Sequence, residues 1–191
     1  TGEYPAVIHF DPTYRFFHTL LATGANAENV QRKRSYLVGM LGEKIAPEYL
    51  TVVDDGRAPG GIHSSPYDDE GVPKRRVTVI EGGVLKEYLH NSYTAGKEGI
   101  ESNGCAFREG YATPPEIGPS NIRIEPGDMS LDDMVREMGT GVIIYKGMLI
   151  PDPVTGEISH SLDFGFWVEG GEVKRPLRGV FVGSSALDLL K

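Results

Sequence analysis

Glycine and proline constrain the fold of this chain more than any other feature of its sequence. The 191 residues include 25 glycines and 13 prolines, about a fifth of the chain against an average of roughly 12%. Both residue types interrupt regular helices and strands and favour turns. The two segments where they concentrate, residues 56–73 and 101–120, are expected to be loops. The composition therefore predicts many turns, short strands and few long helices.

Two β-hairpins are expected where short strand-like segments flank a pair of glycines. The first joins residues 75–80 to 84–89, and the second joins residues 164–169 to 172–177. Other short strands are predicted over residues 4–10, 50–53, 121–124 and 142–145.

One longer helix is predicted over residues 11–23. Asp11 suits its N-cap position, Pro12 its first helical position and Gly24 its C-cap. Its apolar stripe consists of Phe16, Phe17, Leu20 and Leu21. Shorter helices are predicted over residues 36–42, 91–99 and 130–138, and from residue 184 or 185 to 191 after a lead-in at 179–182; residues 25–34 are a short helix or a loop. Because the strands are short, joined by hairpins and scattered among helices, we predict an α+β fold with a mostly antiparallel sheet.

Charge and composition exclude several classes of protein. The chain has 19 Lys and Arg against 27 Asp and Glu, a net charge of −8, which disfavours binding to nucleic-acid phosphates. A single cysteine, Cys105, rules out an intrachain disulfide and a zinc site made of cysteines alone. The sequence has neither an apolar run of about 20 residues nor a signal-peptide pattern. We therefore expect a cytoplasmic protein with no nucleic-acid or membrane partner.

Histidine and cysteine give only weak signs of catalysis. His18 lies in the first predicted helix, but a zinc-binding helix of the zincin type would add a second His one turn later and a Glu as general base. His63, His90 and His160 are dispersed among polar residues and are expected at the surface or in loops. Cys105 has no partner base at a recognisable spacing.

Acidic and basic runs also have ordinary explanations. Asp54 and Asp55, like residues 68–70 (DDE), could attract Ca²⁺ or Mg²⁺, but neither run has EF-hand spacing and both suit turns. The basic residues 74–76 and 32–34 favour a solvated face on so acidic a chain. Neither a glycine-rich phosphate loop nor a Gly-x-Ser-x-Gly elbow is present. These residues alone indicate an α+β domain without a recognisable active site.

One series of motifs is more specific. The central part consists of residues 65–73 (SPYDDEGVP), 75–76 (RR), 81–86 (EGGVLK), 88–89 (YL), 93–95 (YTA) and 102–104 (SNG). Earlier and later parts are residues 42–45 (GEKI), 50–55 (LTVVDD), Asn121, 126–128 (PGD), 138–141 (MGTG), 155–156 (TG) and 165–169 (GFWVE). Together they resemble the TldD/PmbA family, once called modulators of DNA gyrase, over nearly the whole chain.

The resemblance bears directly on zinc. Active members of that family are metallopeptidases with a His-Glu-x-x-x-His motif on the first helix of this domain and a Cys ligand near their C-terminus. Aligned without gaps, the motif falls on His18, Thr19 and Thr23, so only the first His is present. Cys105 does not stand at the position of the family's Cys. The resemblance thus implies the PmbA or TldE-like branch, with no catalytic residue, no metal ligand set and no zinc of its own.

The resemblance also implies an organisation and partners. Residues 1–191 are expected to form a single C-terminal domain, a fragment lacking the N-terminal domain and the extreme C-terminus of the family. The expected partner is a TldD-type subunit or a second copy, forming a dimer that acts on unfolded peptides.

Three hypotheses follow. The first is a non-catalytic, TldE-like subunit of a peptidase complex. The second is an active hydrolase with an unconventional site, made by His18 with Cys105 or with residues 68–70. The third is a protein-binding modulator, for example of DNA gyrase.

Overall fold

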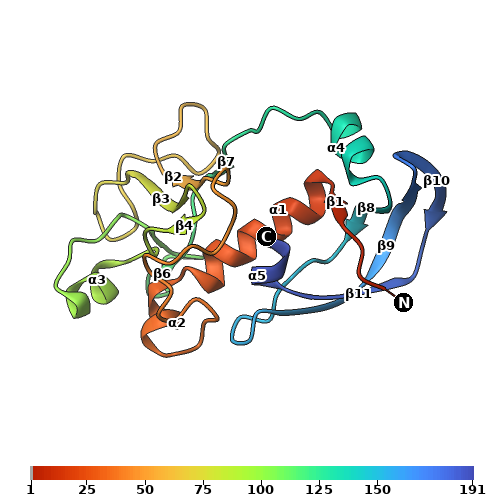
Figure 1. Cartoon of the computed structure of the whole chain (residues 1–191). Helices are drawn as coiled ribbons and strands as arrows, with labels where there is room; N and C mark the ends of the chain where they lie inside the picture. The colour runs from red at the N-terminus through yellow and green to blue at the C-terminus, as the bar shows by residue number, and fades with distance from the viewer. Residues whose placement is uncertain (1) are drawn as a thin grey trace.

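The computed structural model describes residues 2–191 and has two main β-sheets with helix α1 between them (Figure 1). The helical elements are α1 Phe10–Thr19, the π-helical turn η1 Leu20–Gly24, α2 Ala27–Gln31, α3 Ser92–Glu98, α4 Leu131–Met138 and α5 Ala186–Leu189. The strands are β1 Ala6–Ile8, β2 Val52–Asp55, β3 Arg76–Glu81, β4 Val84–Leu85, β5 Ala106–Phe107, β6 Glu116–Ile117, β7 Ile122–Ile124, β8 Gly141–Gly147, β9 Glu157–Glu169, β10 Glu172–Leu177 and β11 Val180–Ser185. The predicted α+β class is confirmed.

The larger sheet is built around β9. Its order is β1-β8-β9-β10, and β11 also pairs with β9. Only β1 and β8 run parallel; β8, β10 and β11 are all antiparallel to β9. β10 pairs with the last part of β9 and β11 with its first part, so the two strands follow one another along the same edge. The expected glycine turn at Gly170 and Gly171 joins β9 to β10, and both glycines have positive φ.

The smaller sheet has the order β4-β3-β2-β7 and is antiparallel throughout. β3 and β4 form the first predicted hairpin. Gly83, in its turn, has φ +77 and lies so close to the backbone of Ala46 that a Cβ would collide with that carbonyl oxygen. A glycine is required here for both reasons.

The main core lies around α1 and η1. Apolar side chains from both sheets pack there, so the helix is the element that both sheets cover; the fully buried members include Leu20, Leu21, Val52, Ile80, Ile144 and Leu162. A smaller cluster under α4 contains Val135, Ile143 and Val168. Within residues 2–191, no helix combines the length and the apolar character needed to cross a membrane.

The helix α1 begins earlier than its sequence indicated. Its N-cap is His9, not Asp11, and Pro12 is its third residue instead of its first. The reason is the sheet: His9 N–H donates to the carbonyl oxygen of Ile144 in β8 at 2.9 Å, which holds the chain extended up to the residue where the helix starts. Pro12 is tolerated because the first N–H groups of a helix need no intrahelical partner.

Two other expectations were wrong. Residues 36–42 form turns instead of a helix, because Gly39 and Gly42 have positive φ and the local bonds are of the short i→i+3 kind. The expected final helix is present as α5, with Ser185 as its N-cap, and the lead-in to it is strand β11, which pairs with β9. The segment 101–120 is not all loop, since β5 and β6 pair within it.

Candidate functional site

The three motif positions lie where α1 passes into η1. His18 is exposed, Thr19 is the last residue of α1, and Thr23 lies in the π-helical turn. The turn is closed by an i→i+5 hydrogen bond from Ala25 N–H to the carbonyl oxygen of Leu20 at 2.7 Å. The Thr23 hydroxyl donates to the carbonyl oxygen of Thr19 at 2.7 Å.

The π-helical turn matters for the spacing of the motif. In an α-helix, residues five apart point about 140° away from each other at 3.6 residues per turn. A turn with i→i+5 bonds is wider and brings such residues closer to one face, and turns of this kind are frequent at functional sites. Positions 18 and 23 are five apart, so the backbone has the shape that two ligands at this spacing need.

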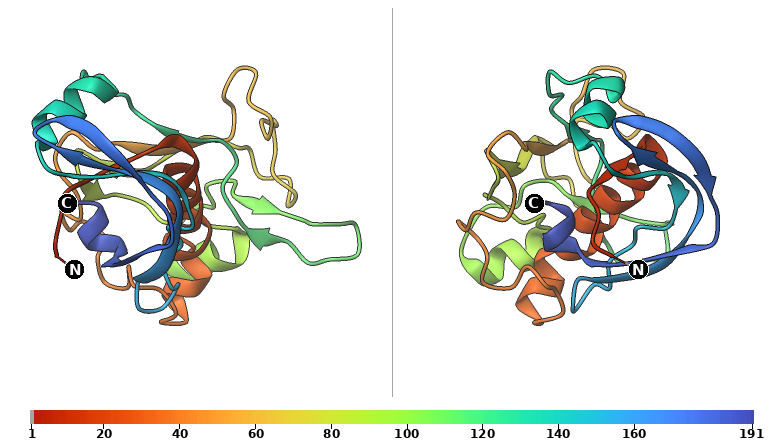
Figure 2. Two further views of the ribbon diagram at one scale, coloured as in Figure 1. Left: turned by 90° about the vertical axis from the view of Figure 1, so that its right-hand side faces the viewer. Right: turned by 45° about the vertical axis from the view of Figure 1, so that its right-hand side comes forward.

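A polar cleft of about 890 Å³ opens beside this helix end. Its walls come from α1, η1 and α2, from the loop around residues 63–65 and from the hairpin of β5 and β6, whose connecting loop projects from the body (Figure 2). Both charges occur in the cleft. The lining includes His18, Glu28, Asn29, His63, Ser64, Asp69, Lys74, Arg108, Glu116 and Ser120.

The floor of the cleft is tied to strand β2 through Ser120. Lys74 Nζ donates to the Ser120 hydroxyl at 2.7 Å, and the Ser120 N–H donates to Asp54 Oδ1 at 2.7 Å. Asp54 is only 1% exposed. Burial raises the pKa of this carboxyl to about 6, against the lowering effect of the backbone N–H groups of Ser120 and Asn121.

Cys105 is not placed for catalysis. It is buried in the main core and does not line the cleft that contains His18. Burial strongly raises the pKa of its thiol, and the nearby carboxylate of Asp54, with Oδ2 4.0 Å from Sγ, acts in the same direction. A nucleophilic cysteine needs the opposite, a thiolate that forms readily. The pairing of His18 with Cys105 therefore loses its support.

The acidic run at residues 68–70 is occupied by backbone N–H groups. Asp68 is buried and accepts from Glu70 and Val72 at 2.9 Å and from Ala106 at 3.1 Å. Its two neighbours do the same: Asp69 accepts from Arg108 N–H, and Glu70 accepts from Ser92 N–H, both at 2.7 Å. Of the three, only Asp69 reaches the cleft. The run holds loops together, as its turn-like sequence indicated.

His90 lies in a loop, as its expectation as a surface or loop residue allowed, but it is buried, with 4% of its surface exposed. Its Nδ1 lies 3.2 Å from the hydroxyl of Thr94, and its Nε2 lies 3.9 Å from a carboxylate oxygen of Glu98. Burial lowers the pKa of His90, although Glu98 acts in the opposite direction. His90 precedes Asn91, the N-cap of α3, and does not line the cleft.

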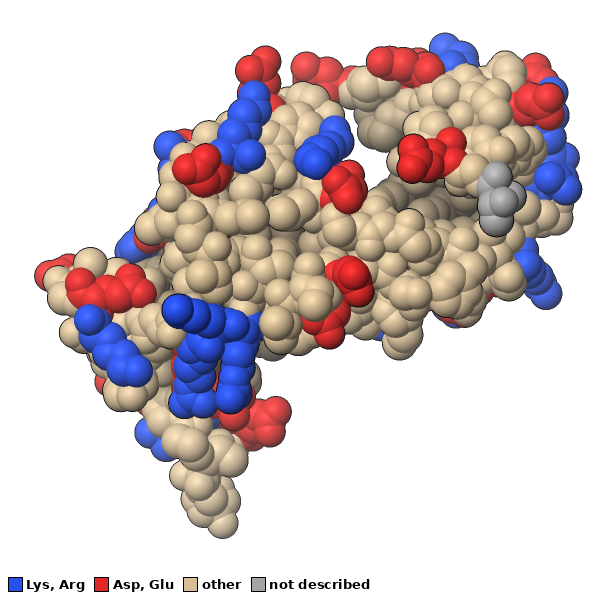
Figure 3. All heavy atoms as spheres, turned by 60° about the horizontal axis from the view of Figure 1, so that its bottom comes forward, with Lys and Arg blue, Asp and Glu red and all other residues tan. Residues whose placement is uncertain are grey.

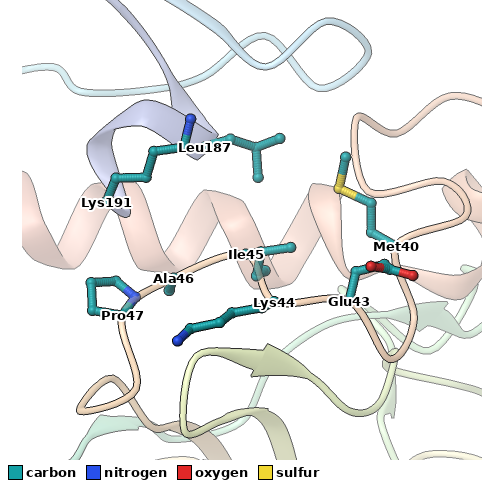
Figure 4. A pocket seen from close by; sticks show the side chains of 8 residues that line it. All are labelled: Met40, Glu43, Lys44, Ile45, Ala46, Pro47, Leu187 and Lys191. Atoms are coloured by element: carbon teal, nitrogen blue, oxygen red, sulfur yellow. The ribbon is translucent and has the colours of Figure 1, made fainter.

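A second hollow, of about 570 Å³, lies between residues 40–47 and α5. Figure 4 shows Met40, Ile45 and Leu187 facing one another across it, with Lys44 and Lys191 at its margin. Its lining is mainly apolar and contains neither His nor Cys, so it offers less for catalysis than the cleft at His18.

Basic and acidic side chains are interspersed over much of the surface (Figure 3). Arg75 pairs with Glu87, Arg76 with Glu125, and Arg32 with Glu28. These pairs place an acidic partner beside three of the six basic residues at positions 32–34 and 74–76.

The side chains at the three motif positions do not provide the ligands that zinc requires. They supply one imidazole, from His18, and two threonine hydroxyls, and the hydroxyl of Thr23 is bonded to the helix backbone. Among residues 2–191, no group of three or more His, Cys, Asp or Glu side chains is arranged to hold a metal ion. Because structural and catalytic zinc sites need at least three protein ligands, these residues do not fit zinc.

Comparisons with known proteins agree with the fold and the motif region. The family model described as "PmbA/TldA metallopeptidase C-terminal domain" matches residues 1–191. The chain belongs to the PmbA/TldD metallopeptidase family. A metalloprotease from Methanocaldococcus jannaschii is 31% identical over 99% of this chain and 42% of its own length.

Two solved structures are also similar. The first, a candidate modulator of a DNA gyrase from Thermotoga maritima, is 34% identical, with a TM-score of 0.90 over 100% of this chain and 43% of its own. TldE from Thermococcus kodakarensis is 30% identical, with a TM-score of 0.84 over 99% of this chain and 43% of its own. The chain thus spans about two fifths of the relatives that it matches.

Proposed function

We propose that this chain is the C-terminal domain of a non-catalytic, TldE-like subunit in a cytoplasmic peptidase complex that acts on unfolded peptides. Its partner is a homologous TldD-type subunit with an intact His-Glu-x-x-x-His motif. The observation that carries the proposal is the chemistry at the helix end: Thr19 and Thr23 stand where a general base and a second imidazole are needed. A threonine hydroxyl replaces neither group.

The shape of the domain supports a role in binding peptides. The cleft beside His18 contains hydrogen-bond donors and acceptors of both charges, as an extended peptide requires. The outer edge of β10 and β11 is a second place where main-chain groups could receive an added strand. The similarity to TldE supports the subunit role.

The first experiment measures metal and activity. The purified chain is equilibrated with Zn²⁺, passed through a desalting column and analysed by mass spectrometry for metal, and its cleavage of an unfolded peptide is followed by chromatography. We expect far less than one zinc per chain and no cleavage. Stoichiometric zinc that disappears in the His18→Ala variant, together with cleavage by the unmodified chain, would overturn the proposal and favour the unconventional hydrolase.

The second experiment identifies the partner. The full-length protein, tagged and expressed in its native cells, is captured and its associated proteins are sequenced. Recovery of a TldD-type subunit with an intact motif supports the proposal. Recovery of DNA gyrase without such a subunit contradicts it.

A further inference from the structure

Three aromatic rings form a row along the outer face of α1. Phe10, Tyr14 and His18 are four residues apart, so they lie on one side of the helix. The ring centroids of Phe10 and Tyr14 are 6.4 Å apart, and those of Tyr14 and His18 are 5.8 Å apart. Phe10 is 76% exposed and Tyr14 is 54% exposed. We call these three residues the aromatic row.

The row is additional to the apolar face that the fold requires. The opposite side of the same helix buries Phe16 and Phe17 in the core. An amphipathic helix normally places polar residues on the side that faces solvent. Large aromatic residues kept there in contact with one another contribute little to folding and indicate an interaction site.

The row continues into the cleft. His18 is both its last ring and part of the cleft wall, so a chain leaving the cleft along α1 meets Tyr14 and then Phe10. The cleft is polar and the row is apolar. This arrangement matches a ligand that has a polar backbone with apolar groups attached to it.

We propose that the aromatic row binds an aromatic or large aliphatic side chain of an extended polypeptide whose main chain lies in the cleft. This inference rests on the proposed function and adds a side-chain preference to it. Aromatic rings pair favourably with other rings and with aliphatic groups in offset or edge-on contact. The row would therefore select peptides by their hydrophobic residues.

Charge favours a polypeptide over a single-stranded nucleic acid, although bases also stack on exposed rings. Glu28, Asp69 and Glu116 lie in the cleft beside Lys74 and Arg108. A polypeptide can satisfy both signs, whereas a row of phosphates would meet three carboxylates on a chain with a net charge of −8.

The test compares two fluorescein-labelled peptides made of Gly, Ser and Thr, one with a central Phe and one with a central Ser. Fluorescence anisotropy with the unmodified chain is expected to show about tenfold tighter binding of the Phe peptide, from partial burial of one aromatic side chain. In the Phe10→Ser/Tyr14→Ser variant this tenfold difference disappears, and affinity for the Ser peptide is unchanged. Both positions are exposed, so the variant is expected to fold, which circular dichroism checks.

The matched control is Tyr49→Ser, which removes a side chain that is 80% exposed and belongs to neither the row nor the cleft lining. It should retain the preference for the Phe peptide. If both peptides bind the unmodified chain equally, the inference is wrong and peptide binding stands. If neither binds, the peptide-binding part of the proposed function is also wrong. Competition by oligo(dT), or a self-association that the double variant abolishes, would assign the row to another ligand and overturn the inference.

Discussion

Asp54 gives the stability of this domain a dependence on pH that the structure allows us to calculate. The carboxyl is 1% exposed, and burial raises its pKa from 3.8 to about 6. When the pKa of an acid is higher in the folded state than in the unfolded state, the folded state binds more protons between the two values. Stability then falls as pH rises through that interval.

The magnitude follows from the two pKa values. At 1.36 kcal/mol for each pKa unit, a change from 3.8 to about 6 corresponds to about 3 kcal/mol. This stability is fully present below pH 3.8, is lost between pH 3.8 and about 6, and does not change further above that. The Asp54→Asn variant has no charge to bury and lacks this contribution. The stability of the variant relative to the unmodified chain therefore rises by about 3 kcal/mol between pH 4 and pH 7.

Urea unfolding at four pH values from 4 to 7, followed by far-ultraviolet circular dichroism, measures this difference. Using the difference between two proteins removes contributions from all other titrating groups. Asp152→Asn is the control, because the backbone N–H groups of Thr155 and Val154 lower the pKa of Asp152, so this carboxyl titrates below the measured range. The stability of Asp152→Asn relative to the unmodified chain therefore stays nearly constant from pH 4 to pH 7. A constant difference between Asp54→Asn and the unmodified chain across the range would refute the reasoning.

Three further substitutions test the packing of the loops. Gly83→Ala places a Cβ against the carbonyl oxygen of Ala46 at a positive φ. It should lower the free energy of unfolding, measured with urea, by about 3 kcal/mol or more. The control Gly42→Ala, at a glycine with open space around it, should lower it less. Asp68→Ala leaves three backbone N–H groups without their acceptor and should cost about 3 kcal/mol or more by the same measurement. Asn91→Ala removes the capping box of α3 and should cost about 1 to 2 kcal/mol, seen as a lower melting temperature.

The sequence predicted those parts of the fold whose signals are local. Paired glycines between strand-like segments correctly located two hairpins, and the helix expected over residues 130–138 is α4, which Ser130 caps by accepting from Asp133 N–H at 3.2 Å. The strand β11 was missed because its pairing with β9 depends on contacts outside its own sequence. The burial of His90 was not predicted for the same reason, because its polar neighbours in sequence do not indicate its contacts with Thr94 and Glu98 of α3.

The candidate site was predictable only at the motif. The positions of His18, Thr19 and Thr23 follow from the resemblance to the TldD/PmbA family, whereas the cleft has walls from segments up to about a hundred residues apart, such as His18 and Ser120. The role of Asp68 was likewise not predictable, because its third hydrogen bond comes from Ala106 in strand β5, 38 residues further along the chain. The aromatic row, by contrast, has a signal in the sequence, because Phe10 and Tyr14 precede His18 at intervals of four residues.

The π-helical turn η1 keeps its shape through hydrogen bonds that do not involve the motif side chain of His18. A turn of this kind leaves carbonyl groups without regular helical partners, and here side chains supply them. Asn26 Nδ2 donates to the carbonyl oxygen of Ala22 at 3.2 Å, Asn29 Nδ2 donates to that of Thr23 at 3.0 Å, and the Ser35 hydroxyl donates to that of Gly24 at 2.6 Å. The turn is therefore held by these hydrogen bonds and by the burial of Leu20 and Leu21. The proposed non-catalytic role requires that the backbone shape of the cleft be kept by such contacts while Thr19 and Thr23 stand at the motif positions.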